Sequence, residues 1–278
     1  MAVGLNSGPS DPESILDITL ARLEIGLQIR HIATFSIRHC APDAQAGEVL
    51  ADSDMRPFDH IPVLDDGRCL GVLRRSEVPE DRTVRDQMLP LHDGMLVAAD
   101  MPILQFMSLM DDAPYRLVVD GTRVRGIVTR SDLLKLPVRV VVFALVTHLE
   151  MIMASVIAAA FGTDEAWLKL LGGKRRDGVI QKMEKLKGDG LDPSHLACTD
   201  FCDKRDILAK ELKRANIFSS SKAKRFTSSL KKIERVRNTL AHAGEYAHDQ
   251  AELHTFLDTV GSTQDWIRFL EEHNHKGR

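Results

Sequence analysis

The chain lacks most features of secreted and membrane proteins. Its four cysteines are too few and too scattered for a disulfide framework. They are Cys40, Cys69, Cys198 and Cys202. No basic stretch followed by an apolar run and a cleavage site opens the sequence, so we expect no secretory signal. The longest apolar segment, residues 140–161, carries His148 and Glu150, which a membrane-spanning helix holds only at considerable cost. These absences predict a cytoplasmic protein without membrane contact.

Aromatic residues are also scarce, at 5% of the chain. Few of them lie between basic residues, which argues against recognition of single-stranded nucleic acid by base stacking. Charge is unevenly distributed: residues 1–138 carry a net charge of −7 and residues 139–278 one of +4. Between Lys169 and Lys232, 17 basic residues accompany 8 acidic ones. This pattern predicts an anionic partner for the second half.

The chain contains an internal repeat at an offset of 55 residues, in which segment 58–78 returns, altered, as 113–133. Six residues are identical in both copies. In the first copy they are Val63, Asp65, Arg68, Gly71, Arg75 and Ser76. Each copy is predicted to form a strand, a tight acidic turn, a second strand and a helix. The repeat therefore indicates two copies of one structural unit, whose strand-to-helix junction suits a sugar or a phosphate.

The sequence divides into three regions. Residues 1–30 are expected to form a tail and a helix that begins near Asp11 and Pro12, and residues 31–137 hold the repeat. Pro137 marks the expected boundary, and residues 138–278 show helical patterns only. Helices are expected over residues 138–161, 164–171, 177–187, 194–215, 219–243 and 250–273. The expected fold class is α+β, with a repeat of β-α-β-β-α units followed by an all-α bundle.

The repeat resembles a paired cystathionine-β-synthase (CBS) domain. The residues that carry the resemblance are 61–65 (IPVLD) with 71–73 (GVL), and 117–120 (LVVD) with 126–132 (GIVTRSD). It implies two pseudo-symmetric units that bind a regulatory adenine nucleotide, such as ATP, ADP, AMP or a derivative. By this resemblance Thr129 contacts phosphate or ribose, and Asp132 accepts hydrogen bonds from the ribose hydroxyls.

Further side chains are candidates for this nucleotide site. Arg130 and Arg116 add positive charge for a phosphate chain, and Ile61 and Pro62 line an adenine pocket. The first copy departs from the pattern, because Arg74 stands in place of the hydroxyl and Glu77 in place of the aspartate. The alternative interpretation is that Asp132 only caps a helix and that the repeat is a dimerisation scaffold.

A short motif, Arg237-Asn238-x3-His242, lies near the end of the fifth expected helix of the second half. Its bare spacing is common, but here an asparagine follows the arginine, Gly244 follows as a helix stop, and the preceding helix is basic. In that setting the motif resembles the Arg-x4–6-His motif of the HEPN superfamily. These all-α domains include metal-independent endoribonucleases of toxin and defence systems. The resemblance covers about residues 138–275.

The residue types suit this chemistry. His242 can take a proton from the ribose 2′-hydroxyl or deliver one to the leaving oxygen, and Arg237 can stabilise charge on the scissile phosphate. Asn238 lies four residues before His242 and shares its helical face. Arg237 and His242 are about 140° apart around an ideal helix. They converge only if the helix end distorts or if residues of two subunits combine, as the HEPN resemblance implies.

Several other residues bear on function. Five basic residues are expected to contact RNA: Lys174, Arg175 and Arg176, which follow two glycines in an expected loop, and Lys231 and Lys232. Glu150 is expected to have a partner such as an arginine, because an unpaired buried carboxylate is costly. His195, Cys198 and Cys202 share helical spacing, but no fourth zinc ligand is apparent, so no metal site is expected.

These observations predict a metal-independent endoribonuclease of toxin or defence type, regulated by an adenine nucleotide on the CBS pair and active without a catalytic cofactor. RNA is the expected substrate, and a homodimer or a dimer of dimers is the expected assembly. The alternative is a non-catalytic, nucleotide-sensing module that binds RNA or protein and dimerises through its helical domain. Direct adjacency of the two domains at Pro137 gives a short path for allosteric coupling.

Overall fold

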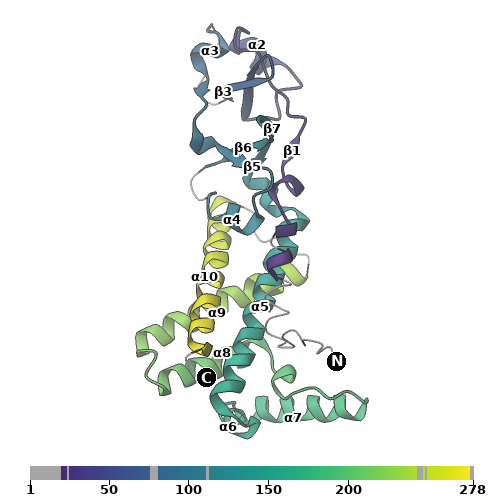
Figure 1. Ribbon diagram of the computed structural model, residues 1–278, viewed down its shortest axis with the longest axis vertical. Helices are drawn as coiled ribbons and strands as arrows, with labels where there is room; N and C mark the ends of the chain where they lie inside the picture. The colour runs from purple at the N-terminus through teal and green to yellow at the C-terminus, as the bar shows by residue number, and fades with distance from the viewer. Residues whose placement is uncertain are drawn as a thin grey trace, which may run out of the picture. The chain divides into compact units, whose positions relative to one another are not determined.

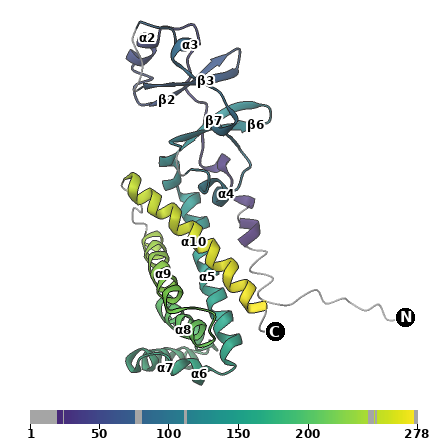
Figure 2. The same ribbon diagram turned by 90° about the vertical axis from the view of Figure 1, so that its left-hand side faces the viewer.

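The computed structural model describes residues 20–23, 25–75, 81–110, 113–242, 247 and 249–275. The chain divides into two compact units (Figures 1 and 2). One comprises residues 21–141 and is called the mixed unit here. The other comprises the described residues from 142 to 275 and is called the helical unit. This arrangement confirms a mixed α+β fold followed by a helical C-terminal region. Most of the expected N-terminal helix lies outside the described residues.

The mixed unit contains two sheets. The first has the strand order β2-β3-β4, formed by His60–Asp65, Arg68–Arg74 and Leu89–Pro90. The second has the order β1-β7-β6-β5, formed by Thr34–Phe35, Arg123–Thr129, Tyr115–Asp120 and Leu96–Ala98. The hairpins β2–β3 and β6–β7 are the two repeat copies, and each turns through a glycine with positive φ, Gly67 or Gly121. The predicted strand-turn-strand pattern is therefore confirmed in both copies.

The two copies exchange their edge strands. Strand β1 precedes the first copy but pairs with β7 of the second, and β4 precedes the second copy but pairs with β3 of the first. The two exchanged strands obey the 55-residue offset, because Thr34–Phe35 correspond to Leu89–Pro90. Neither sheet is complete without a strand from the other half. The repeat thus forms one structural unit.

Gly71 and Gly126 permit this exchange. A Cβ atom on Gly71 would lie 2.2 Å from the carbonyl oxygen of Leu89 in β4, and one on Gly126 would lie 2.8 Å from that of Thr34 in β1. Both distances are too short for real Cβ contacts, and backbone atoms cannot rotate away as a side chain can. The identity of these two glycines in the repeat therefore has a steric cause.

Short helices and two apolar clusters complete the mixed unit. The helices are η1 (Ile29–His31), α2 (Ala46–Ala51), α3 (Val84–Gln87), η3 (Asp93–Met95), α4 (Ile103–Met107) and η4 (Arg130–Leu134). One cluster is centred on Ile61, Val63 and Leu73 of the first copy. The other joins Val72 of β3 to Tyr115 and Leu117 of β6, so it connects the two sheets. His60 and Tyr115, again 55 residues apart, lie with ring centroids 4.4 Å apart.

The helical unit contains helices and no strands among the described residues. They are α5 (Leu136–Phe161), which begins in the mixed unit, α6 (Asp164–Leu168), α7 (Gly173–Gly188), η5 (Leu196–Cys198), α8 (Phe201–Arg214), α9 (Ser220–Ala241) and α10 (Gln250–His275). The prediction of one helix over residues 194–215 is wrong, because η5 and α8 are separate helices. Thr199 and Asp200 are extended, and a capping box between Asp200 and Asp203 starts α8 anew. The loop expected at residues 173–176 is also wrong, because α7 begins at Gly173.

Helix α5 is long and apolar enough to cross a membrane by length and composition, but half of its most apolar window is buried inside the structure. Two of its polar residues, His148 and Glu150, contact other helices of the helical unit. His148 Nε2 lies 3.6 Å from Glu271 of α10, and Glu150 accepts a 3.0 Å hydrogen bond from Lys204 of α8. Figure 2 shows α10 crossing α5. These contacts are those of a helix in a protein core.

Candidate nucleotide and ribonuclease sites

The predicted nucleotide residues Thr129 and Asp132 lie at the junction of β7 and η4. Thr129 is the N-cap of η4 and forms a capping box with Asp132. The Thr129 backbone N–H donates to Asp132 Oδ2 at 2.6 Å, and the Thr129 hydroxyl donates to the same oxygen at 2.9 Å. Lys135 Nζ lies 2.6 Å from the other oxygen, Oδ1. The capping role of the alternative interpretation is therefore present, and both carboxylate oxygens have partners.

This junction still has the chemistry of an anion and sugar site. A carboxylate offers about four lone-pair positions, so Asp132 retains acceptor capacity beyond its present partners. Thr129 and Arg130 are half-buried, and Ser131 Oγ lies 2.8 Å from Thr129 Oγ1. Lys135 adds a positive charge that the sequence analysis did not assign to the site. The sequence does place Lys135 three residues after Asp132, a spacing at which side chains of one helix meet, and this spacing could have indicated the contact.

The other predicted nucleotide residues are differently placed. The Arg116 guanidinium donates to the carbonyl oxygens of Leu109, at 2.6 Å, and Tyr115, at 3.3 Å. Ile61 belongs to the apolar core with 1% of its surface exposed, and Pro62 is buried beside it. Neither side chain therefore presents an open surface to an adenine ring in this conformation. Glu77, one of the departures in the first copy, lies outside the described residues.

The predicted ribonuclease residues lie at the C-terminal end of α9. Ser219 caps the start of this helix through a hydrogen bond from the Lys222 backbone N–H to its hydroxyl. His242 is the C-cap, and its backbone N–H still donates to the Asn238 carbonyl at 3.1 Å. The last helical hydrogen bond of α9 thus reaches the His242 backbone N–H, and the helix ends at that residue. Asn238 and His242 are exposed and share one face.

Arg237 lies on a different face of α9. Its guanidinium is 3.5 Å from Glu150 of α5, which also accepts from Lys204 of α8. Lys204 donates in addition to the Thr199 carbonyl at 2.9 Å. The prediction that Glu150 has an arginine partner is confirmed. Because helical hydrogen bonding continues to the His242 N–H, Arg237 and His242 of one chain lie on different faces of α9 and do not converge.

The predicted RNA-binding residues are only partly free to bind. The Arg175 guanidinium donates to Asp203 at 3.0 Å and to Asp200 at 2.6 Å. These hydrogen bonds lower the pKa of Asp200 and raise that of Arg175. Arg176 Nε lies 3.8 Å from Asp177 Oδ1. Lys174 is exposed. Arg175 therefore serves the α7–α8 junction in this conformation.

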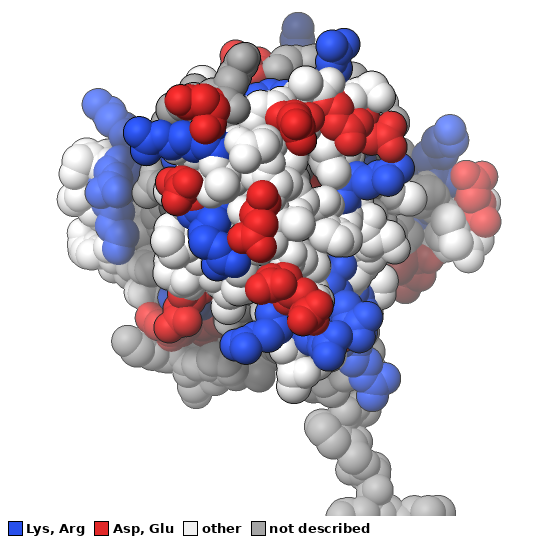
Figure 3. All heavy atoms as spheres, turned by 90° about the horizontal axis from the view of Figure 1, so that it is seen from above, with Lys and Arg blue, Asp and Glu red and all other residues white. Residues whose placement is uncertain are grey.

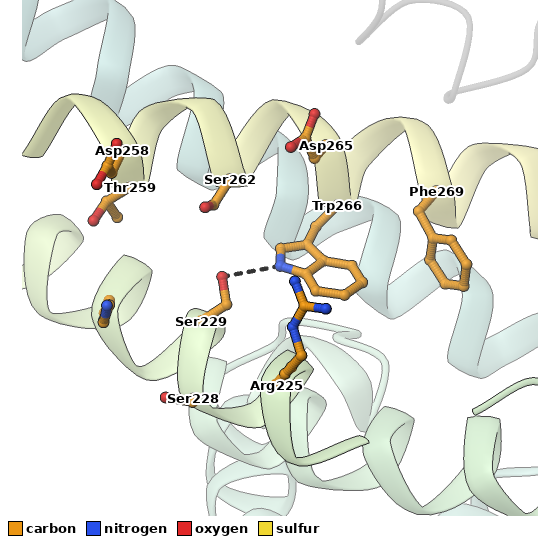
Figure 4. A pocket seen from close by; sticks show the side chains of 10 residues that line it. Arg225, Ser228, Ser229, Asp258, Thr259, Ser262, Asp265, Trp266 and Phe269 are labelled. Carbon is orange, nitrogen blue, oxygen red and sulfur yellow. Dashed lines mark hydrogen bonds between the residues drawn. The ribbon is translucent and has the colours of Figure 1, made fainter. Parts of the chain in front are cut away.

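Lys231 and Lys232 are both exposed, but they lie on different faces of α9. Lys232 belongs to a groove of about 430 Å³ between α9 and α10 (Figure 4). The remaining lining residues are Arg225, Ser228, Ser229, Asp258, Thr259, Ser262, Asp265, Trp266 and Phe269. Trp266 Nε1 donates to Ser229 Oγ at 2.9 Å. This proximity of aromatic and basic side chains arises from packing between distant segments, so no local sequence pattern reveals it.

The three residues with helical spacing that suggested zinc do not form a common site. His195 Nδ1 lies 2.5 Å from Asp164 Oδ2, Cys198 is buried in η5, and Cys202 lies on α8. Among the described residues, the ligand atoms of Asp200, Cys202 and Asp203 do lie within 4.8 Å of one another. Their carboxylates already bind the Arg175 guanidinium. This cluster is therefore an ion-pair network.

A family comparison identifies the segment that contains the nucleotide candidates. The family model described as "CBS domain" matches residues 89–139. Residues 89–139 form a CBS domain. The domain includes β5, β6, β7 and η4, and hence Thr129, Arg130 and Asp132. The CBS resemblance of the second repeat copy is thereby confirmed.

Solved structures, among them CBS domains, are similar to part of the chain. One is the CBS domain of a bacterial CNNM/CorC family Mg²⁺ transporter in complex with ATP, at 20% identity and a TM-score of 0.35, covering 44% of this chain and 94% of that one. CBSX2 in complex with AMP is 19% identical with a TM-score of 0.34, and the match covers 41% of this chain and 97% of that one. The acetoin utilization protein AcuB from Vibrio cholerae is 15% identical with a TM-score of 0.35, and the match covers 41% of this chain and 91% of that one. No curated protein matches the chain.

Proposed function

We propose that the chain is a metal-independent, HEPN-type endoribonuclease whose activity is regulated by an adenine nucleotide bound to its CBS pair. The observation that carries the catalytic part is the exposure of Asn238 and His242 on one face of α9, the helix with the most basic surface. An exposed imidazole beside an amide is accessible to a polymeric substrate. The regulatory part rests on the CBS domain and on the hydroxyl and carboxylate at the junction of β7 and η4.

In the proposed reaction the ribose 2′-hydroxyl attacks the adjacent phosphate, and the bond from that phosphate to the next nucleotide's 5′ oxygen breaks. His242 accepts the 2′ proton or protonates the leaving oxygen. Arg237 stabilises the charge on the phosphate. Since Arg237 and His242 of one chain diverge, the complete site combines Arg237 of one chain with His242 of the partner subunit. The proposed active form is therefore a cytoplasmic homodimer or a dimer of dimers, with a role of toxin or defence type.

Nuclease activity is tested with purified full-length protein, total RNA and EDTA. We expect cleavage by the wild type and a loss of about 10²–10⁴-fold for His242→Ala, the range contributed by a general acid or base. His254→Ala is the matched control, because His254 is an exposed histidine on α10. Mixing inactive Arg237→Ala with inactive His242→Ala should restore partial activity if one intact composite site forms. Identical RNA patterns for wild type and His242→Ala would refute the catalytic proposal.

Nucleotide binding is tested by calorimetry with ATP, ADP and AMP. Asp132→Asn should weaken binding by about 10–150-fold, because a hydrogen bond to a charged group contributes about 1.5–3 kcal/mol. Asp120→Asn, which alters an exposed carboxylate at the end of β6 in the same copy, is the control. Thermal unfolding of both variants separates lost binding from lost capping of η4. Absence of binding by the wild type would remove the sensor proposal.

A second candidate function is a nucleotide-sensing module that binds RNA or protein without cleaving it. The observation in its favour is the ion pair between Arg237 and Glu150, which gives Arg237 a structural role within the helical unit. This candidate predicts RNA retention without new cleavage products under every nucleotide condition. The nuclease assay above separates the two candidates.

A further inference from the structure

We infer that one exposed row of α9 is a track for a single RNA strand that ends at His242; this inference rests on the proposed RNA substrate. The row consists of Lys224, Ser228, Lys231, Arg235, Asn238 and His242. Successive members are separated alternately by four and three residues, so they align along one face of an α-helix. All six are exposed.

The charge of this row is unopposed on its own helix. Glu234 is the one acidic residue of α9, and its carboxylate accepts a 2.8 Å hydrogen bond from Arg205 of α8. Among the described residues, Lys224, Lys231 and Arg235 have no ion-pair partner. By contrast, acidic and basic side chains are interspersed on the face shown in Figure 3, which is typical of a solvated surface. The row therefore offers three uncompensated positive charges.

The composition of the row favours a polyanion over an apolar partner. It contains no hydrophobic side chain, whereas membrane-binding helices and helix-docking surfaces need an apolar face. From Lys224 to His242 the row spans about 27 Å at 1.5 Å per residue. At about 3.4 Å per stacked nucleotide, this length accommodates about eight nucleotides. A strand with stacked bases held along the row would reach His242.

The row separates two lysines that are neighbours in sequence. Lys231 belongs to it, whereas Lys232 lines the groove beside α10 together with Asp258 and Asp265. Arg237 points toward Glu150 and is likewise outside the row. The inference therefore predicts that Lys231→Gln weakens RNA binding more than Lys232→Gln does.

The test measures binding of a fluorescent 12-nucleotide uridine RNA to full-length protein by anisotropy, in a His242→Ala background that prevents cleavage. The triple variant Lys224→Gln, Lys231→Gln, Arg235→Gln should lower the magnitude of the slope of log affinity against log salt by about 2, since each single-strand phosphate contact contributes about 0.7. The control triple variant carries the same charge change on exposed lysines of α7: Lys182→Gln, Lys185→Gln, Lys187→Gln. It should leave the slope unchanged.

Equal slopes for the two triple variants would overturn the track. Displacement of the RNA by polyglutamate at the same charge concentration would also overturn it, because the row would then bind any polyanion. Failure of the track and failure of the nuclease proposal are distinguishable. Loss of RNA binding in the row variant, with no cleavage by the wild type, supports the track alone. Cleavage that depends on His242, with equal binding slopes, supports the nuclease alone.

Discussion

At the scale of single residues, several side chains and glycines have a structural role, and this role constrains any function that the same residues can have. Asp132 caps η4 and pairs with Lys135, so a ribose would have to share its carboxylate. Arg237 similarly neutralises Glu150, and a scissile phosphate would compete with that carboxylate. Such sharing makes the occupancy of each site sensitive to the conformation of its neighbours. It also means that stability must be measured beside activity for every variant.

Gly126 gives a prediction at this scale. Gly126→Ala should destabilise the mixed unit by about 1–3 kcal/mol, because its Cβ would lie 2.8 Å from the Thr34 carbonyl oxygen. Calorimetry should show the change. Tryptophan fluorescence should not, since Trp167 and Trp266 both lie in the helical unit. Gly178→Ala in α7 is the control, because a Cβ added there would meet no atom within 4 Å. An unchanged calorimetric transition for Gly126→Ala would contradict the steric explanation.

At the scale of elements, the helical unit is joined by a buried charge network. Glu150 of α5, Lys204 of α8 and Arg237 of α9 meet at one point, and the side chain of Lys204 is only 6% exposed. Burying such charges is costly, but removal of one partner costs more, because it leaves the others unpaired. The network therefore fixes the rotation of α9, and with it the direction in which Asn238 and His242 point.

Glu150 accordingly provides a test of this network. Glu150→Gln should destabilise the helical unit by about 3–5 kcal/mol, since it leaves Lys204 and Arg237 without a counter-charge. Urea unfolding followed by tryptophan fluorescence measures the change. Glu184→Gln, which alters an exposed residue of α7, should change the free energy of unfolding by less than about 0.5 kcal/mol. Equal effects of the two substitutions would show that the network contributes little.

The elements also show how far sequence analysis reaches. The strand pairs of both copies and most helices of the second half followed from local patterns, and the apolar sequence around Glu150 indicated that this carboxylate needs a partner. The break at Thr199 and the helical start at Gly173 were missed, because capping by Asp200 and Asp203 and the pairing of Arg175 with them decide both. The strand exchange and the nearness of Trp266 to Arg225 depend on contacts between distant segments. Periodicity carries no information about such contacts.

At the scale of the whole molecule, helix α5 is continuous from Leu136 in the mixed unit to Phe161 in the helical unit. A helix transmits rotation and translation better than a flexible linker does. Regulation by this route requires that the nucleotide bind two arrangements of the chain with different affinity. The continuous helix provides a physical connection between the CBS domain and the proposed nuclease.

Such coupling must be reciprocal. If AMP or ATP changes the RNA affinity of the His242→Ala protein by about 5–150-fold, saturating RNA must change the nucleotide affinity by the same factor. Calorimetry with each ligand, in the presence and absence of the other, measures both factors. Asp132→Asn should abolish the effect of the nucleotide on RNA binding. A nucleotide that binds tightly while RNA affinity changes less than about twofold would show that the domains act independently.

The exchanged edge strand β1 has a consequence for synthesis of the chain. Thr34 pairs with Ile127, which leaves the ribosome more than ninety residues later. At about 5–20 residues per second, β1 waits roughly 5–20 s for its partner. During that interval its backbone N–H and C=O groups remain open to other strands. Slow elongation across residues 36–126 is therefore expected to increase aggregation of nascent chains.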